Sequence, residues 1–344
     1  MKSRRLITAA VAVAAVLTAS ACGSGSGSGS GTEQAAGLTI YSGRSETLVK
    51  PILDQLEAAT GVKVAVRYGG SSELAAQLLE EGDATKADLF FSQDAGALGA
   101  LGAAGRLEPL DASVTGKVIN GFADPEGLWV ATSARARVIA YNPKLAPEAT
   151  SITSIDAVLD PKYKAKVGFA PTNASFHSFV TALRVVKGEE GAREWLTKFK
   201  ANEPKSYDKN TTVLEGVDKG EVALGLINHY YWYEKVAEVG EDKVTAKIHF
   251  LNADDPGALI NVAGVGILKG SANQAAAVKA IDFLLSTEGQ QYFADETSEY
   301  PVVDGVTTKA NLPALKDMQK SSVDLNKLDS LAQTLELLGE VGLT

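Results

Sequence analysis

The sequence predicts an α/β fold made of two lobes that are joined by extended crossing strands. Short strands and helices alternate from residue 38 to 94, and a second alternation begins near Tyr163, which indicates two units that each carry a sheet. Two extended runs, 129–143 and 257–268, are longer than an ordinary strand and can pass between the units. The chain has 344 residues, more than one hydrophobic core usually serves.

The N-terminal segment is predicted to be a targeting signal that lies outside the fold. The first five residues include three basic ones, Lys2, Arg4 and Arg5, and residues 6–17 form an uncharged apolar stretch. This stretch is shorter than the ~20 residues that a membrane-spanning helix needs. We therefore expect a signal peptide over 1–21.

The residue that follows this segment, Cys22, is the only cysteine of the chain. A cysteine directly after small residues is similar to the lipidation box of bacterial lipoproteins, although Ala19 stands where that box usually has leucine. We expect Cys22 to be lipidated and residues 22–36, rich in Gly and Ser, to form a flexible tether. An ordinary secreted protein is the alternative.

The composition makes the predicted mature chain acidic and free of internal disulfide bonds. The formal net charge is −9, and removal of residues 1–21 makes it −12, because this segment holds three basic residues and no acidic one. An acidic surface disfavours nucleic acids and anionic membrane surfaces as partners.

The first unit is predicted to be a parallel sheet with one polar edge. The elements expected in order are strand 38–41, helix 48–59 ended by Gly61, strand 62–68, helix 74–81 with Ser72 as its N-cap, and strand 87–91. The polar, glycine-containing loops after the three strands meet at the carboxyl edge of the sheet, where open α/β sheets bind ligands. These loops are 42–45, 69–72 and 92–94.

The extended runs define the expected lobes. The first lobe comprises 37–134 with 264–300, and the second comprises 135–263 with 301–344. Arg135 and Arg137 alternate on the first crossing, and we expect them to face solvent or to pair with acidic neighbours.

The second unit opens with strand 165–170 and the polar turn 171–176, followed by helices over 177–186 and 191–201. Asn173 and Ser175 lie at a predicted helix N-terminus, where hydroxyls and free N–H groups favour an anion. Plain helix capping explains the same residues equally well.

A pair of adjacent tyrosines, Tyr230 and Tyr231, lies where a predicted strand is followed by a predicted helix. Residues 221–227 read as a buried strand, and 233–239 read as a helix that ends at Gly240. Neighbouring residues inside a strand point to opposite faces, but at a strand-to-helix turn both phenols can face one cleft. Two phenolates there are hard anionic oxygen donors, suited to a hard and highly charged cation. Packing with surface hydroxyls is the alternative for each tyrosine.

The remaining segments carry no catalytic signature. Residues 275–285 read as a helix, 299–302 as an extended segment because of Pro301, and 309–344 as terminal helices. Nucleotide-binding loops of the GxxxxGK[ST] or GxGxxG type, a GxSxG elbow and an HExxH helix are all missing from the sequence. We expect no enzymatic activity.

The segment Ile-Asn-His-Tyr-Tyr-Trp-Tyr at 227–233 carries a family resemblance, together with less specific segments in matching order. The chain resembles the extracytoplasmic substrate-binding proteins of bacterial ABC importers, specifically the branch that binds ferric iron. The resemblance implies the two-lobed fold of periplasmic binding proteins. The less specific segments are 38–44, 87–91, 134–143, 170–174, Asn210 and 299–302.

The resemblance also implies a ligand set. Tyr230 and Tyr231 match the residues that bind Fe(III) as phenolates in this family, and Arg44 is expected to pair with a bound carbonate. The residues that match positions holding a synergistic anion, carbonate or phosphate, are Asn173, Ala174, Ser175, Asn210 and Asn228.

The chain departs from the family pattern in the first lobe. Some members use a His and a Glu there, but this chain has Ser45 and Gln93, the latter followed by Asp94. Other members use a third tyrosine near the position of Ser175. Ser45, Gln93 and Asp94 are therefore first-lobe candidates only, and anion oxygens and water are expected to complete the coordination.

The function expected from this resemblance is capture of Fe(III), free or as a small ferric chelate, and its delivery to an ABC permease with its ATPase. The protein is expected to be an extracytoplasmic monomer held at the cell membrane by lipid on Cys22. The alternative is a binding protein for a small organic or phosphorus-containing anion without metal, recognised by Arg44, Asn173 and Asn210. An enzyme on a similar frame is a third possibility, but no nucleophile–base pair points to it.

Overall fold

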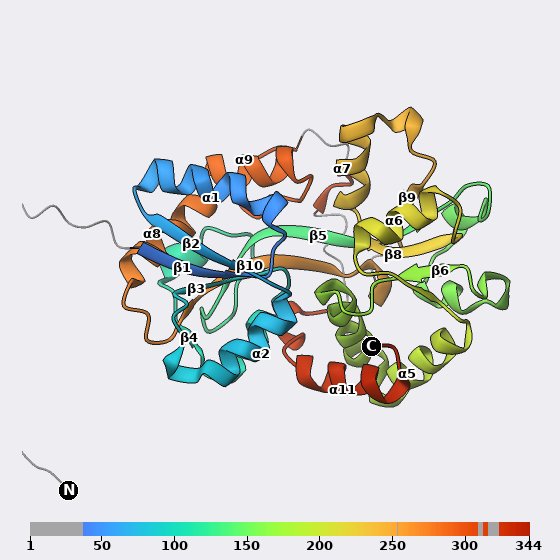
Figure 1. Cartoon of the computed structure of the whole chain (residues 1–344), viewed down its shortest axis with the longest axis horizontal. Helices are drawn as coiled ribbons and strands as arrows, with labels where there is room; N and C mark the ends of the chain where they lie inside the picture. The colour runs from blue at the N-terminus through green and yellow to red at the C-terminus, as the bar shows by residue number, and fades with distance from the viewer. Residues whose placement is uncertain (1–36, 253, 309–311, 316–322) are drawn as a thin grey trace, which may run out of the picture. The chain divides into compact units, whose positions relative to one another are not determined.

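The computed structural model describes residues 37–252, 254–308, 312–315 and 323–344 (Figure 1). The predicted signal peptide, Cys22, the tether and part of the predicted terminal helices lie outside these residues. Among the described helices, none combines the length and the apolar character needed to cross a membrane.

The strands form one continuous hydrogen-bonded path in the order β2-β1-β3-β10-β5-β8-β6-β7, with β4 paired to β10 and β9 paired to β5. β1, β2 and β3 are parallel, as the sequence predicts, so the loops after them meet at one edge. The strands are β1 Gly37–Ser42, β2 Lys63–Tyr68, β3 Leu89–Ser92, β4 Leu107–Glu108, β5 Val130–Tyr141, β6 Val167–Phe169, β7 Lys205–Ser206, β8 Leu224–Asn228, β9 Lys247–His249 and β10 Ile260–Leu268.

The long strand β5 passes from one hydrophobic core to another. Its first half pairs with β10, and its second half pairs with β8 and β9. Ala136 belongs to the first core, whereas Ile139 belongs to a second core and Val138 to a third. Because adjacent strand residues point to opposite faces, the second half of β5 has an apolar core on each side. The predicted crossing strand is confirmed (Figure 1).

The helices cover these cores with apolar faces. The first core takes the buried sides of α1, α3 and α8, the second those of α5 and α11, and the third those of α6 and α7. The helices are α1 Glu46–Thr60, α2 Ser71–Glu81, α3 Ala95–Ala103, α4 Ala112–Thr115, α5 Ala174–Ala201, α6 Asn210–Asp218, α7 Tyr230–Val239, α8 Gln274–Leu284, α9 Thr287–Glu296 and α11 Leu331–Val341.

One local expectation needs correction, and a second is confirmed. Ser72 does not cap α2: Gly70 is the N-cap residue, and the Ser72 hydroxyl donates instead to Nδ1 of His177 at 3.0 Å. The two helices expected over 177–186 and 191–201 are confirmed: α5, which begins at Ala174, consists of two helical stretches separated at Gly188, where φ is 72° and ψ is 170°. Glycine tolerates this backbone conformation, which disfavours other residues.

The boundaries between the hydrophobic cores do not coincide with the lobe limits expected from the sequence. β10 packs in the first core from Leu259 onward, because it pairs with β3 and with the first half of β5. Val302 and Leu331 also pack in the first core, whereas Leu337 packs in the second. The described part of the C-terminal segment therefore contacts both lobes and is not confined to the second.

Candidate functional site

The tyrosine pair lies at the end of β8 and the start of α7, as the sequence predicts. β8 ends at Asn228, and Tyr230 and Tyr231 are the first two residues of α7. Their ring centroids are 4.1 Å apart, with an angle of 33° between the ring planes. Tyr230 is 1% exposed, and Tyr231 is half-buried. The turn thus places two phenols side by side rather than on opposite faces.

His229 fixes this turn against the crossing strand. The backbone N–H of Ala136 donates to Nδ1 at 3.1 Å, and Nε2 donates to the carbonyl oxygen of Ser298 at 3.0 Å. These two bonds define a neutral imidazole with its proton on Nε2. Burial, the largest cause, lowers the pKa of His229 to about 4. The histidine therefore serves to orient the tyrosine-bearing turn.

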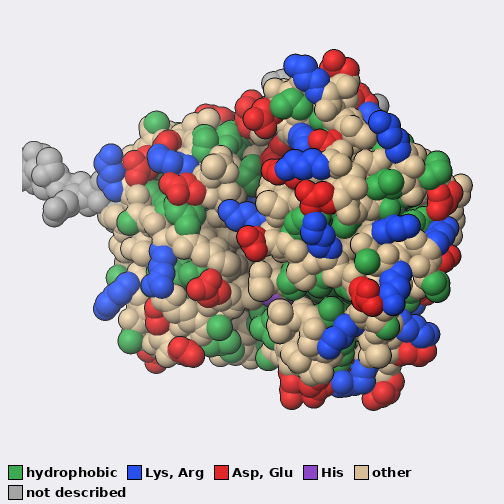
Figure 2. All heavy atoms as spheres, turned by 45° about the vertical axis from the view of Figure 1, so that its right-hand side comes forward, with side chains coloured by type: hydrophobic (Ala, Val, Ile, Leu, Met, Phe, Trp, Pro, Cys, Tyr) green, Lys and Arg blue, Asp and Glu red, His purple; other side chains and the backbone are tan. Residues whose placement is uncertain are grey.

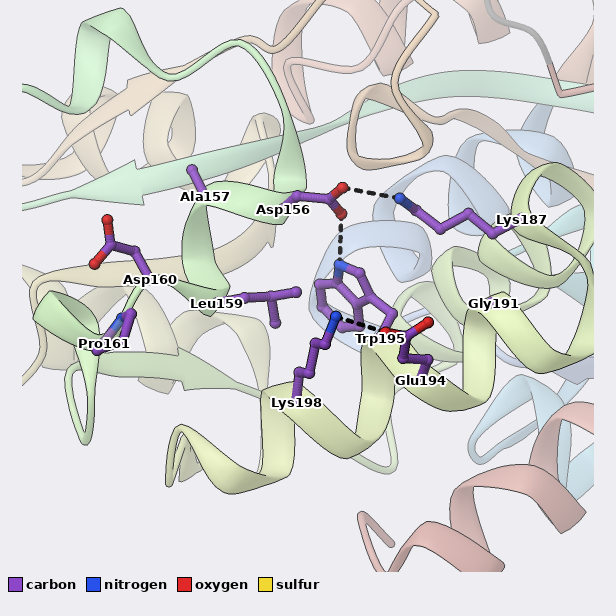
Figure 3. A pocket seen from close by; sticks show the side chains of 10 residues that line it. All are labelled: Asp156, Ala157, Leu159, Asp160, Pro161, Lys187, Gly191, Glu194, Trp195 and Lys198. Carbon is purple, nitrogen blue, oxygen red and sulfur yellow. Dashed lines mark hydrogen bonds and ion pairs between the residues drawn. The ribbon is translucent and has the colours of Figure 1, made fainter.

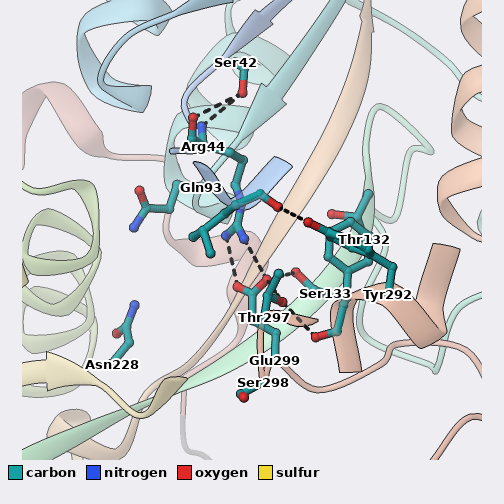
Figure 4. A network of polar contacts seen from close by, with 12 residues as sticks. Ser42, Arg44, Gln93, Thr132, Ser133, Asn228, Tyr292, Thr297, Ser298 and Glu299 are labelled. Atoms are coloured by element: carbon teal, nitrogen blue, oxygen red, sulfur yellow. Dashed lines mark hydrogen bonds and ion pairs between the residues drawn. The ribbon is translucent and has the colours of Figure 1, made fainter. Parts of the chain in front are cut away.

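Arg44 and Glu299 form a buried bidentate ion pair on the first-lobe side (Figure 4). Nη1 and Nη2 of Arg44 donate to the two carboxylate oxygens at 3.0 and 2.6 Å, and Ser133 and Thr297 also donate to Oε2. Burial acts to raise the pKa of Glu299, but the charges of Arg44 and Arg135 outweigh it and lower that pKa below its ordinary value. The segment that carries Glu299 reaches this place because Tyr300 pairs with Ala134 of β5.

Arg135 and Arg137 do not face solvent, contrary to expectation. They are 1% and 4% exposed, and with Ser133 they share one face of β5. Nη1 of Arg137 donates to Oδ1 of Asn228 at 3.4 Å. Within the described part of the chain, Nε, Nη1 and Nη2 of Arg135 all lack a hydrogen-bond partner. Burial, the largest cause, lowers the pKa of both guanidinium groups.

The tyrosines lie within the electrostatic reach of these cations. Burial, followed by the neighbouring Tyr231, raises the pKa of Tyr230 well above its ordinary value, whereas Arg44 and Arg135 act to lower it. The Tyr230 phenol is consequently neutral without a ligand. A bound cation must displace its proton, and the guanidinium groups make that displacement easier.

The residues expected to hold an anion lie together. Asn173 caps α5 by accepting from the N–H of Ser175 at 2.9 Å, and it accepts from Nδ2 of Asn210 at 3.2 Å. The Ser175 hydroxyl accepts from Nδ2 of Asn228 at 3.0 Å. Ala174 occupies the first position of α5 between them. The structure brings the five residues to one place, and their anion-binding role stays a prediction.

The three first-lobe candidates take different positions. Ser45 is exposed, and its hydroxyl bonds to that of Thr47 at 2.9 Å, outside the network around Ser175. Gln93 is half-buried and donates from Nε2 to the Ser175 hydroxyl at 3.2 Å. Asp94 is buried, caps α3 by accepting from the N–H of Ala97 and accepts from the Ser178 hydroxyl at 3.2 Å. Gln93 and Asp94 thus contact the second lobe directly.

Sequence reasoning missed two acidic residues near the site, Glu299 and Glu234. Glu234 lies one helical turn after Tyr230 on α7, and no described residue bonds its Oε1. Burial, and then the charge of Glu299, raise the pKa of Glu234 to about 8. The position of Glu234 four residues after Tyr230 is a signal that could have identified it. The described residues contain no group of three or more His, Cys, Asp or Glu side chains that could hold a metal ion.

A surface cavity of about 830 Å³ lies elsewhere, beside the second core (Figure 3). Four of its charged side chains take part in pairs: Asp156 accepts from Lys187 and from Nε1 of Trp195, and Lys198 pairs with Glu194. On the face shown in Figure 2, basic and acidic side chains are interspersed rather than separated by sign. Neither feature competes with the tyrosine site for a ligand-binding role.

Comparison with known proteins identifies the family of this chain. The sequence model of the bacterial extracellular solute-binding proteins matches residues 84–331. The chain belongs to this family. It is 34% identical over 316 residues to the major ferric iron-binding protein of Neisseria meningitidis, and the match covers 91% of this chain and 95% of that protein. The family resemblance drawn from the sequence motifs is confirmed.

Two solved structures share the fold. Iron-bound HitA from Pseudomonas aeruginosa has a TM-score of 0.83 and 33% identity, and the match covers 89% of this chain and 99% of that chain. The Trichodesmium protein IdiA, or FutA, in complex with iron and citrate ligands has a TM-score of 0.74 and 28% identity, with coverage of 90% and 100%. The predicted two-lobed α/β fold is confirmed.

Proposed function

We propose that this chain is a solute-binding protein that captures Fe(III) between its two lobes and delivers it to an ABC permease and its ATPase. The observation that carries the proposal is the pair of adjacent phenols, 4.1 Å apart between ring centroids, at the carboxyl end of β8. Fe(III) is a hard cation that prefers anionic oxygen ligands, and two phenolates supply them. The relatives named as ferric iron-binding proteins support the same assignment.

The proposal includes a synergistic anion at the start of α5. Asn173, Ser175 and Asn228 present amide, hydroxyl and backbone groups there, and Asn210 bonds to Asn173. Carbonate or phosphate at this position would complete the coordination that the phenolates leave open. This requirement is stronger here than in relatives with a histidine and a glutamate, because Ser45 and Gln93 are neutral.

The lipid anchor on Cys22 is also part of the proposal, and it rests on the sequence of residues 1–22. A Cys22→Ala variant expressed with its signal segment is expected to appear in the soluble extracytoplasmic fraction, whereas the unaltered protein stays with the membrane. Equal membrane retention of both would contradict the anchor.

The test of iron capture is a titration of the purified domain with ferric citrate, with and without bicarbonate or phosphate, followed by visible absorption. We expect a phenolate-to-iron charge-transfer band that requires the anion. In the double variant Tyr230→Phe/Tyr231→Phe the band is expected to vanish, and iron affinity should fall by more than about 100-fold, since loss of supporting residues alone costs about 10–100-fold. Tyr68→Phe, on β2, is the matched control and should retain the band.

The second candidate function is binding of a small organic or phosphorus-containing anion without metal. The guanidinium of Arg135, which has no hydrogen-bond partner among the described residues, and the neutral residues at 45 and 93 favour it. It predicts that an anion alone stabilises the protein against heat, with no absorption band at any iron concentration.

A further inference from the structure

Arg135 is a buried cation whose side-chain nitrogens have no hydrogen-bond partner among the described residues. It lies on β5, and the charges of Arg44, Tyr230 and Glu299 act on its guanidinium. Five N–H donors belong to an arginine side chain. Among the described residues none accepts from any nitrogen of Arg135, although only 1% of the residue is exposed.

A second unpaired donor faces Arg135 across the sheet ladder. Asn261 of β10 is the residue opposite Arg135, so both side chains lie on the same face. Oδ1 of Asn261 accepts from the N–H groups of Ala95 and Val262, and Nδ2 has no partner in the described chain. Two neighbouring strands therefore direct unpaired donors to one place.

The terminal nitrogens of Arg44 can bind an anion only if they first release Glu299. Both of its terminal nitrogens donate to Glu299, and only Nε is unpaired among the described groups. The expectation that Arg44 pairs with a bound anion thus meets competition from a buried carboxylate. No carboxylate of the described residues accepts a hydrogen bond from Arg135.

Burying a guanidinium that has neither a hydrogen bond nor an ion pair costs a large desolvation free energy. Its planar fork matches the two oxygens of a carboxylate or carbonate. We propose that Arg135, assisted by Asn261, binds a planar oxyanion that enters with the cargo, either carbonate or a carboxylate group of a ferric chelate. This proposal rests on the proposed function and names the guanidinium that receives the cargo's anion.

The neighbouring residues allow one ligand to reach both anion positions. Arg137 lies two residues after Arg135 on the same strand face, roughly 7 Å along the strand. It bonds to Asn228, which belongs to the expected anion position at the start of α5. A chelator with several carboxylates can span that distance. Carbonate is too small to do so and would occupy one position only.

Asp94 provides the structural alternative. Its Oδ2 lacks a partner in the described residues, and its charge acts on Arg135. If Arg135 serves only to compensate Asp94, its removal must destabilise the protein. If Arg135 is an unpaired ligand-binding cation, replacement by an apolar side chain of similar length must stabilise the ligand-free protein.

The test uses the metal-free protein with sodium citrate, bicarbonate or phosphate, and records thermal unfolding together with calorimetric titration. The variants are Arg135→Met and Arg135→Lys, with Arg67→Met on β2 as the matched control. We expect Arg135→Met to melt at a higher temperature than the unaltered protein without anion, and its affinity for citrate or bicarbonate to fall at least tenfold. Arg135→Lys, which keeps the charge but loses the fork, should lose severalfold, and Arg67→Met should lose none.

The anion affinity decides the outcome. Unchanged citrate and bicarbonate affinity in Arg135→Met would overturn the proposal whatever its melting temperature. If that variant fails to fold, Arg135→Lys carries the test, and unchanged affinity there would overturn it. A tenfold loss for citrate alone identifies the chelate as the source, and a loss for bicarbonate alone identifies carbonate.

The iron proposal fails by a different readout. If the unaltered protein binds citrate through Arg135 but shows no charge-transfer band with iron, iron capture is wrong and the anion site stands. A band in the unaltered protein with full anion affinity in Arg135→Met would support iron capture and reject the role of Arg135.

Discussion

The two halves of the candidate site differ in what their side chains already bind. On the second-lobe side, the phenols of Tyr230 and Tyr231 make no hydrogen bond within the described residues, while His229 and Asn228 hold the turn beneath them. On the first-lobe side, most candidate groups are bound to protein: Arg44 to Glu299, Asp94 to the start of α3, and Gln93 to Ser175. One half presents ligands, and the other mainly presents contacts that hold the lobes together.

The first-lobe half also makes direct contacts with the second lobe around Gln93 and Asp94. Bonds from Gln93 to Ser175, from Ser178 to Asp94 and from Ser72 to His177 connect the two cores. They hold the first lobe against the second where a metal ligand would otherwise do so. In the proposed site the remaining oxygens come from an anion, and Arg135 is the cation that we propose binds it.

The largest expected effect comes from breaking the first-lobe ion pair. Glu299→Ala leaves Arg44 buried without its carboxylate, and removing one partner of such a pair destabilises a protein by about 3–5 kcal/mol. Urea unfolding at neutral pH measures this loss. Glu296→Ala, an exposed residue of α9, is the control and should change stability little. A loss below about 1 kcal/mol for Glu299→Ala would show that the pair is not structural.

The next largest effect is a pH-dependent change in the free energy of unfolding that Glu234, in the second-lobe half, causes. The folded-state pKa of Glu234 is raised to about 8, above its ordinary value of 4.5. Between these values the unfolded chain loses this proton while the folded chain keeps it. Stability is therefore highest at and below the ordinary pKa and falls as the pH rises toward 8, by up to about 1.4 kcal/mol per pH unit.

Urea unfolding from pH 5 to 9 measures this slope. Glu234→Gln should flatten it and should be the more stable protein at pH 8. Glu238→Gln, an exposed change one turn further along α7, should leave the slope intact. Identical slopes in all three proteins would contradict the buried, protonated state of Glu234.

The smallest effect tests whether the first-lobe half can be given a ligand. Gln93→Glu supplies a carboxylate beside Ser175, and a hard anionic oxygen should strengthen Fe(III) binding. We expect a gain of about tenfold, or about 1.4 kcal/mol, with weaker dependence on bicarbonate. Gln77→Glu, on α2, is the control. Unchanged iron affinity in Gln93→Glu would mean that residue 93 lies too far from the metal.

Local patterns predicted the second-lobe half well and the first-lobe half poorly. The β8–α7 junction, the parallel strands β1 to β3 and the crossing strand β5 follow from hydrophobic periodicity and turn residues, which act over a few positions. The partner of Arg44 is 255 residues away in sequence, and no short-range pattern encodes such a pairing. Likewise, the alternation of Arg135 and Arg137 is the same sequence pattern whether that strand face is exposed to solvent or covered by other elements. Only the packing in the structure shows that both residues are buried.

The most direct test of the account is the position of iron in crystals of the protein grown with ferric citrate, located by anomalous diffraction at the iron absorption edge. The account predicts one iron bonded to the phenolate oxygens of both Tyr230 and Tyr231, with an oxyanion oxygen on the metal and the same anion on Arg135. Iron bound elsewhere, or bound without either phenolate, would contradict it.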